Sequence, residues 1–129
     1  MSPAPSRAAN DSLDRICHFA RDYRAERHRT PRQLYDATGY SASHAKLTQE
    51  QIEEFVTRDV SLIDDWHHFT QDKRWTPAWG LTQRSDNEWV VFHMSRSGRA
   101  DCELLFATPV SACALLIRLE MEVFRCADQ

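Results

Sequence analysis

The spacing of apolar residues changes near Trp75, and this change constrains the fold more than any other feature of the chain. Before it, apolar residues recur at helical spacing. After it, between about residues 77 and 107, turn clusters separate three strand-like runs. Thr108-Pro109 then opens a further stretch of helical periodicity that extends to about residue 126. We therefore expect an α+β fold with several N-terminal helices, an antiparallel meander of three or more strands, and a long C-terminal helix packed on the sheet.

Local signals mark the start of two N-terminal helices. Thr30 and Thr48 are each followed three residues later by glutamine, which is the arrangement of a capping box. Pro31 occupies the first helical position after Thr30, where a backbone N–H is not needed. Gly39 is suited to end that helix, because glycine adopts the left-handed backbone conformation without strain.

Polar residues mark the remaining helix starts. We expect residues 1–10 to be disordered, because the segment begins polar and rich in proline. Asp11 or Ser12 is the expected cap of the first helix, and Ser61 is the expected cap of the helix before the sheet.

No internal repeat or linker divides the chain, so the sequence predicts a single domain over residues 1–129.

Two-residue alternation gives the middle and third strands two faces each. We expect the closing helix to cover the face that carries Val90, Phe92, Met94, Cys102, Leu104 and Phe106. Unless the N-terminal helices cover it, the other face remains open, and it carries Trp89, Val91, His93, Asp101, Glu103 and Leu105.

Glu120 lies in the middle of the apolar arc of the predicted C-terminal helix. Burying an isolated carboxylate is costly, so we expect a largely buried Glu120 that pairs with a cation or another hydrogen-bond donor. Arg74 and Lys73 are the preferred cations, because they lie where the helices give way to the first strand.

Composition excludes several classes of function. A net charge of −3 and a pI near 6.0 do not provide the basic excess that direct nucleic-acid binding usually needs. No apolar run approaches the roughly 18 residues of a membrane span, and no secretory signal is recognisable, so a cytoplasmic protein is expected. Such a location favours reduced thiols over disulfides for the four cysteines, which are Cys17, Cys102, Cys113 and Cys126.

No motif for catalysis or metal binding is present. Asp64 and His68 lie four residues apart beside His67, but a third ligand at fixed spacing is missing, so we expect no metal site. No glycines of a nucleophile elbow surround any serine or cysteine, and three glycines in the whole chain leave no phosphate-binding loop. The sequence therefore predicts a protein that is not an enzyme and needs no cofactor.

The order of several segments resembles a known class of bacterial proteins. These segments are Thr48-Gln49-Glu50-Gln51-Ile52, Leu62-Ile63-Asp64-Asp65-Trp66, Asp72-Lys73-Arg74 with Trp79, and Phe106 followed by Ala112-Cys113-Ala114, Ile117 and Glu120. Together they cover about residues 47–121 and look like small proteins similar to the immunity proteins of polymorphic toxins, including contact-dependent growth inhibition systems. The resemblance implies a non-catalytic cytoplasmic protein that binds and blocks one cognate toxin domain. It implies no particular contact residue, because contact residues vary with the toxin.

The residues themselves suggest where such a partner binds. Toxin domains that cut nucleic acid are commonly basic, so carboxylates beside aromatic anchors suit a contact region. The predicted contact residues are Trp89, Val91, His93, Asp101 and Glu103 on the sheet, with Glu50, Glu53, Glu54, Asp64 and Asp65 on the helices.

Alternative functions remain open at this stage, as does the oligomeric state. One is a small enzyme, or a ligand-binding regulatory domain with a pocket between the sheet and the N-terminal helices. Another is an RNA-binding accessory protein that uses the arginines between Arg15 and Arg32.

Overall fold

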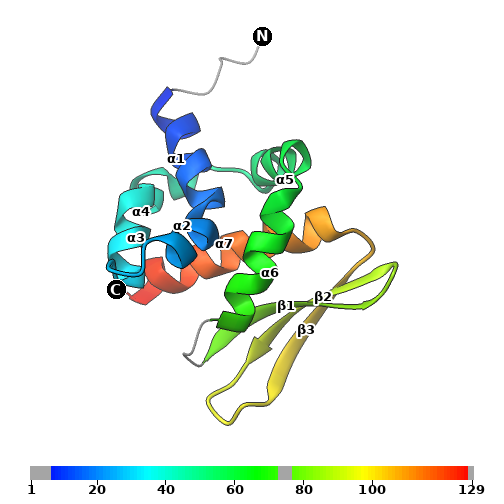
Figure 1. Cartoon of the computed structure of the whole chain (residues 1–129). Helices are drawn as coiled ribbons and strands as arrows, with labels where there is room; N and C mark the ends of the chain where they lie inside the picture. The colour runs from blue at the N-terminus through cyan, green and yellow to red at the C-terminus, as the bar shows by residue number, and fades with distance from the viewer. Residues whose placement is uncertain (1–6, 73–76, 128–129) are drawn as a thin grey trace.

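The computed structural model describes residues 7–72 and 77–127 (Figure 1). In chain order, its elements are α1 (Arg7–Cys17), α2 (Phe19–Ala25), α3 (Pro31–Thr38), α4 (Tyr40–Ser43), the 3-10 helix η1 (His44–Lys46), α5 (Gln49–Arg58), α6 (Ser61–Asp72), β1 (Ala78–Ser85), β2 (Glu88–Met94), β3 (Ala100–Phe106) and α7 (Pro109–Ala127).

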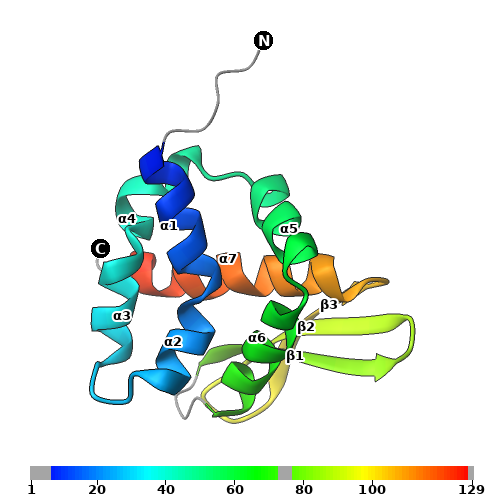
Figure 2. The ribbon, with the colours of Figure 1, turned by 45° about the horizontal axis from the view of Figure 1, so that its top comes forward.

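Helix α7 runs through the centre of the molecule (Figures 1 and 2). Helix α5 packs against α7 on the side away from the sheet, while β1 and β2 pack against its other side. Helix α6 contacts α2, α7 and β1, so it joins the helical part to the sheet. The strands form an antiparallel meander in the order β1-β2-β3. The predicted α+β fold, with its closing helix packed on the sheet, is confirmed.

The two predicted capping boxes are present. The hydroxyl oxygens of Thr30 and Thr48 accept from the backbone N–H of Gln33 and Gln51, and both glutamine side chains accept from the threonine backbone in return. Gly39 ends α3 with a φ of 74°, the left-handed conformation that favours glycine. These boundaries are local, because each depends on side chains only three residues apart.

The expected start of the first helix was wrong. Helix α1 already begins at Arg7, so residues 7–10 are helical rather than disordered, and two alanines in this segment favour that outcome. Ser12 therefore lies inside the helix, where it is buried and donates from Oγ to the Thr38 carbonyl oxygen at 2.7 Å. Its hydroxyl fastens α1 to α3 instead of capping a helix.

The expected cap at Ser61 was also wrong. Ser61 is the first residue of α6, and its backbone N–H donates to Oδ1 of Asp59 at 3.3 Å. The Ser61 hydroxyl donates to the same carboxylate. Both hydrogen bonds lower the pKa of Asp59 below its ordinary value, and the bond from the hydroxyl has the larger effect. Aspartate is as good a cap as serine, and here the earlier of the two residues takes the role.

Trp66 fastens α6 to the N-terminal helices. Its side chain is fully buried, and Nε1 donates to the Cys17 carbonyl oxygen at 2.8 Å. Its ring stacks on Phe19 with the centroids 6.0 Å apart and meets the edge of Phe69 at 5.4 Å. This aromatic cluster fixes the position of α6 against α1 and α2.

Glu120 is buried among the apolar residues of α7, as the sequence predicted. It is 1% exposed, while Leu116, Ile117 and Met121 on the same helix are completely buried. Its predicted cations, Lys73 and Arg74, lie outside the described residues, so the pairing stays a prediction.

Candidate functional site

The register of the three strands decides which side chains share a face. Trp79, His93 and Cys102 are paired across the three strands. Leu81, Val91 and Leu104 are paired in the same way, two residues further along and on the same face. Leu81 and Val91 belong to the main core cluster, against which Trp79, Trp89 and Phe106 also pack. The helix-facing side of the sheet therefore includes Trp89, Val91 and His93.

The predicted contact face is thus not a single surface. In β2, the predicted open residues Trp89, Val91 and His93 face the helices, and Val91 is completely buried. In β3, the predicted assignment of Glu103 and Leu105 to the outer side is correct, since they pair with Phe92 and Val90. The error arose because β2 is apolar at adjacent positions, so alternation has no polar side from which to fix the phase.

The outer face of the sheet has its own small apolar strip. Val90 is only 1% exposed there, although it lies outside the main core cluster. The Phe92 ring lies over Gly80 so closely that a Cβ on Gly80 would come within 2.3 Å of it. Phe92 therefore covers Gly80 on the neighbouring strand. Arg84 of β1 donates a hydrogen bond to Glu103 of β3 at 2.7 Å, and this bond links the two edge strands across β2.

Strand β3 forms an open edge. Residues 100–105, which we call the β3 edge, are all exposed, and β3 pairs with no strand other than β2 in the described part of the chain. Leu104 is 38% exposed and Leu105 is 61% exposed. Asp101 lies near the start of this edge. Its carboxylate lies 2.8 Å from Nδ1 of His93, at the point where the register of β2 and β3 shifts.

An edge of this kind is suited to pairing with another chain. Exposed strand edges present unpaired backbone N–H and C=O groups, and proteins commonly protect them with bulges or charges. The β3 edge has its register shift at its start, and its two carboxylates are Asp101 and Glu103. The remaining part, which contains both exposed leucines, is regular. An extended segment of a partner could add to it as a fourth strand.

The structure does not join the predicted acidic helix residues to the β3 edge. Helix α5 lies on the far side of α7 from the sheet, and α6 packs beside β1, the opposite edge strand (Figure 2). Asp65 also pairs with Arg21 at 2.7 Å, and Glu54 pairs with Arg58. The predicted helix residues therefore lie away from the β3 edge; they are Glu50, Glu53, Glu54, Asp64 and Asp65.

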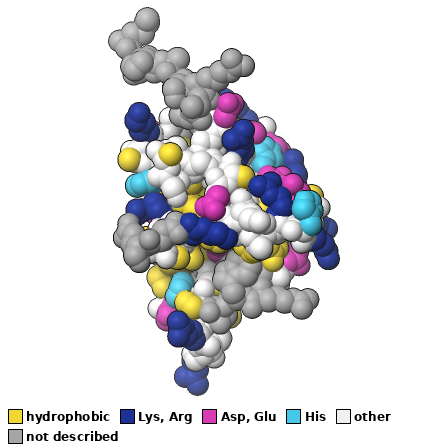
Figure 3. All heavy atoms as spheres, turned by 90° about the vertical axis from the view of Figure 1, so that its left-hand side faces the viewer, with side chains coloured by type: hydrophobic (Ala, Val, Ile, Leu, Met, Phe, Trp, Pro, Cys, Tyr) yellow, Lys and Arg dark blue, Asp and Glu magenta, His cyan; other side chains and the backbone are white. Residues whose placement is uncertain are grey.

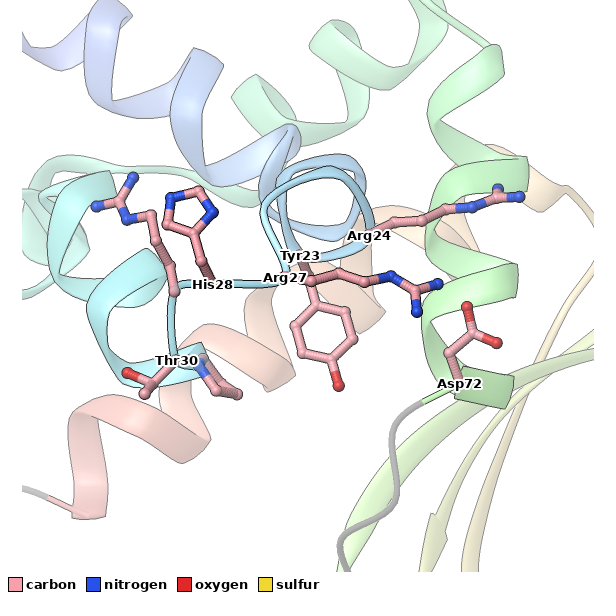
Figure 4. A pocket seen from close by; sticks show the side chains of 8 residues that line it. Tyr23, Arg24, Arg27, His28, Thr30 and Asp72 are labelled. Atoms are coloured by element: carbon pink, nitrogen blue, oxygen red, sulfur yellow. The ribbon is translucent and has the colours of Figure 1, made fainter.

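A cavity of about 540 Å³ is lined by residues of the end of α2, the connection to α3 and the end of α6 (Figure 4). Its lining consists of Tyr23, Arg24, Arg27, His28, Arg29, Thr30, Pro31 and Asp72. The predicted alternative named a pocket between the sheet and the N-terminal helices, and no residue of the three strands lines this cavity. The run of arginines near the end of α2 was the sequence signal for this cavity. The position of Asp72 beside them could not be read from the sequence, because it depends on tertiary packing.

The four cysteines are free thiols in this structure. Cys17 and Cys113 are buried. Burial, followed by the nearby Asp14 carboxylate, raises the pKa of Cys17 to about 12, and burial also raises that of Cys113. These two thiols are therefore poor nucleophiles. Cys102 on β3 and Cys126 near the end of α7 are the exposed ones.

Residues 7–72 and 77–127 contain no group of three or more His, Cys, Asp and Glu side chains placed to hold a metal ion, and Asp64, His67 and His68 form no such group. In the same ranges, no helix has both the length and the apolar character needed to cross a membrane. Comparison with known proteins assigns no relative, because no family model, curated protein or solved structure matches the chain.

Proposed function

We propose that the protein neutralises one cognate bacterial toxin by binding to it, as do the immunity proteins that residues 47–121 resemble. The observation that carries this proposal is the β3 edge, which pairs only with β2 among the described residues and carries exposed leucines and carboxylates. The proposal assigns no chemical step to the chain. Inhibition follows from occupying the surface that the toxin needs for its own activity.

The proposed contact is strand addition. An extended toxin segment pairs with the backbone of β3, and these main-chain hydrogen bonds supply affinity that does not depend on the toxin's side chains. Leu105 on the outer face of the sheet and Leu104 on its helix-facing side give the toxin segment two apolar contacts. Selectivity for one toxin then comes from side chains on both sides of the new strand.

Charge complementarity supports a basic partner. Asp101 and Glu103 lie on the β3 edge, and both are about half exposed, at 52% and 43% of their side-chain areas. A lysine or arginine of the toxin can compete for them with His93 and Arg84. The net charge of −3, which includes the acidic residues of α5 and α6, adds a long-range attraction that increases the association rate at low salt.

The direct test uses the intact protein and the toxin domain encoded by the neighbouring gene. We expect co-expression to restore growth to cells that produce the toxin, and the two purified chains to form a stable complex. A toxin domain from an unrelated system serves as the control and should be neither bound nor neutralised. If the intact protein fails both to bind and to protect against the neighbouring toxin, the proposed function is wrong.

A further inference from the structure

The cavity beside α2 is lined by more positive than negative charge, although the whole chain is acidic. Arg24, Arg27 and Arg29 contribute three positive charges, and Asp72 contributes one negative charge. The lining thus has an excess of two positive charges in a chain whose net charge is −3. A concave surface of one sign concentrates the electrostatic field and attracts an oppositely charged ligand.

Two of these arginines pair with no carboxylate within residues 7–72 and 77–127. Arg29 lies 3.6 Å from the Glu26 carboxylate, but Arg24 and Arg27 form no ion pair with any residue that the structure describes. Other arginines differ: Arg21 and Arg58 each pair with a carboxylate. In Figure 4, Arg24 and Arg27 extend from the end of α2 towards the side on which Asp72 lies. Their planar, fork-like guanidinium groups suit two-point binding of phosphate oxygens.

The remaining walls add an aromatic surface and a hydroxyl group. The ring of Tyr23 is held edge-on against Phe69 with the centroids 5.2 Å apart, so its position is fixed by packing. Thr30 already accepts from the Gln33 backbone N–H at 3.1 Å. Its hydroxyl hydrogen can therefore still donate to a ligand. Thr30 is also the N-cap of the eight-residue helix α3, so the positive end of that helix lies beside it.

We propose that this cavity binds a small molecule that carries a phosphate monoester. A phosphate dianion matches the two arginines, Arg24 and Arg27, that have no carboxylate partner in the described part of the chain, and a volume of about 540 Å³ falls within the range of small-molecule sites. Asp72 repels a phosphate, so it faces the other part of the ligand and accepts hydrogen bonds from its hydroxyl groups. The site is therefore selective for a phosphate ester of a hydroxylated molecule over an inorganic anion such as pyrophosphate.

The distribution of charge argues against a long nucleic acid as the occupant. Figure 3 shows basic side chains interspersed with acidic, histidine and hydrophobic ones on the face towards which α3 and α4 lie in Figure 1. A polyanion needs a continuous basic track that follows its backbone. A compact ligand needs only the few charges that converge at the cavity.

The test is calorimetric titration of the full chain with inorganic pyrophosphate, adenosine monophosphate and uncharged adenosine. We expect adenosine monophosphate to bind more tightly than pyrophosphate, and adenosine not to bind. The double variant Arg24→Ala/Arg27→Ala should weaken monophosphate binding by about tenfold or more, since two charge-assisted contacts are lost. Arg58→Ala, which removes an arginine from α5, is the matched control and should bind as the wild type does.

The variant Asp72→Asn tests whether the carboxylate of Asp72 repels the bound anion. Removing this carboxylate should strengthen pyrophosphate binding, because a repulsive charge is lost from the lining. Weaker pyrophosphate binding in Asp72→Asn would show that Asp72 supports the bound anion rather than repelling it, and would overturn the proposal. So would failure of all three probes to bind, equal affinity in the double variant, or binding of single-stranded RNA alone. None of these outcomes bears on toxin binding, because the cavity shares no residue with the β3 edge.

Discussion

Replacing Leu105 by lysine is expected to weaken toxin binding by about 30-fold or more, the size of effect that defines a binding hot spot. Leu105 is 61% exposed on the outer face of β3, where it has few contacts within the protein to lose. Lysine removes an apolar contact and places a positive charge against a basic partner. Affinity should be measured at one fixed salt concentration, after the melting temperature has shown that the variant is folded.

Val60→Lys is the matched control for this substitution. Val60 is 62% exposed, which is almost the same as Leu105, but it lies at the junction of α5 and α6. The same change there should alter the affinity by no more than about twofold, as for an ordinary surface position. Equal losses in both variants would show a general charge effect, and an unchanged affinity in Leu105→Lys would place the interface elsewhere.

Truncating Glu120 to alanine is expected to lower the free energy of unfolding by about 3–5 kcal/mol, the typical effect of removing one member of a buried ion pair. The side chain is 1% exposed among completely buried apolar residues, so its loss leaves a cavity and an uncompensated partner. Urea unfolding of the wild type and the variant measures this difference.

Glu122→Ala is the control on the same helix. Glu122 is one-third exposed and pairs with Arg125, so its removal should cost at most about 1 kcal/mol. Arg74→Ala and Lys73→Ala test which of the two predicted cations compensates Glu120. An unchanged stability in Glu120→Ala would contradict the paired, buried carboxylate. A large loss in only one of the two cation variants would identify the partner.

The features that could be predicted from the sequence are those set by neighbours along the chain. The capping boxes at Thr30 and Thr48, and the glycine stop at Gly39, each depend on residues within one turn. The burial of Glu120 was predictable because the periodicity of a long helix defines its apolar side. At the start of α6, two potential caps lay two residues apart, and the local sequence did not decide between Asp59 and Ser61.

The faces of the sheet could not be predicted in the same way. Val90 and Val91 are adjacent and both buried, so only the pairing with β1 and β3 determines which one joins the main core. That pairing puts Val91 and Glu103 on opposite faces of the sheet, whereas two-residue alternation predicts a common face for them. The open edge was also hidden, because a strand's position in the sheet depends on topology rather than on its own residues.

The cavity shows the same limit. The arginines that line it are close in sequence and were visible as a charged run, but Asp72 is more than 40 residues further along the chain. Only the packing of α6 against α2 brings this carboxylate to the cavity.

The most direct measurement of the central claim is residue-resolved amide hydrogen exchange of the protein with and without its toxin. Without toxin, alternate amides of β3 should exchange quickly, because those that point away from β2 meet no other strand of residues 7–72 and 77–127. Strand addition predicts that the same alternate amides within residues 100–106 become protected in the complex, while the amides already bonded to β2 change little. Full protection elsewhere, with the outward amides of β3 still exchanging quickly, would contradict binding at this edge.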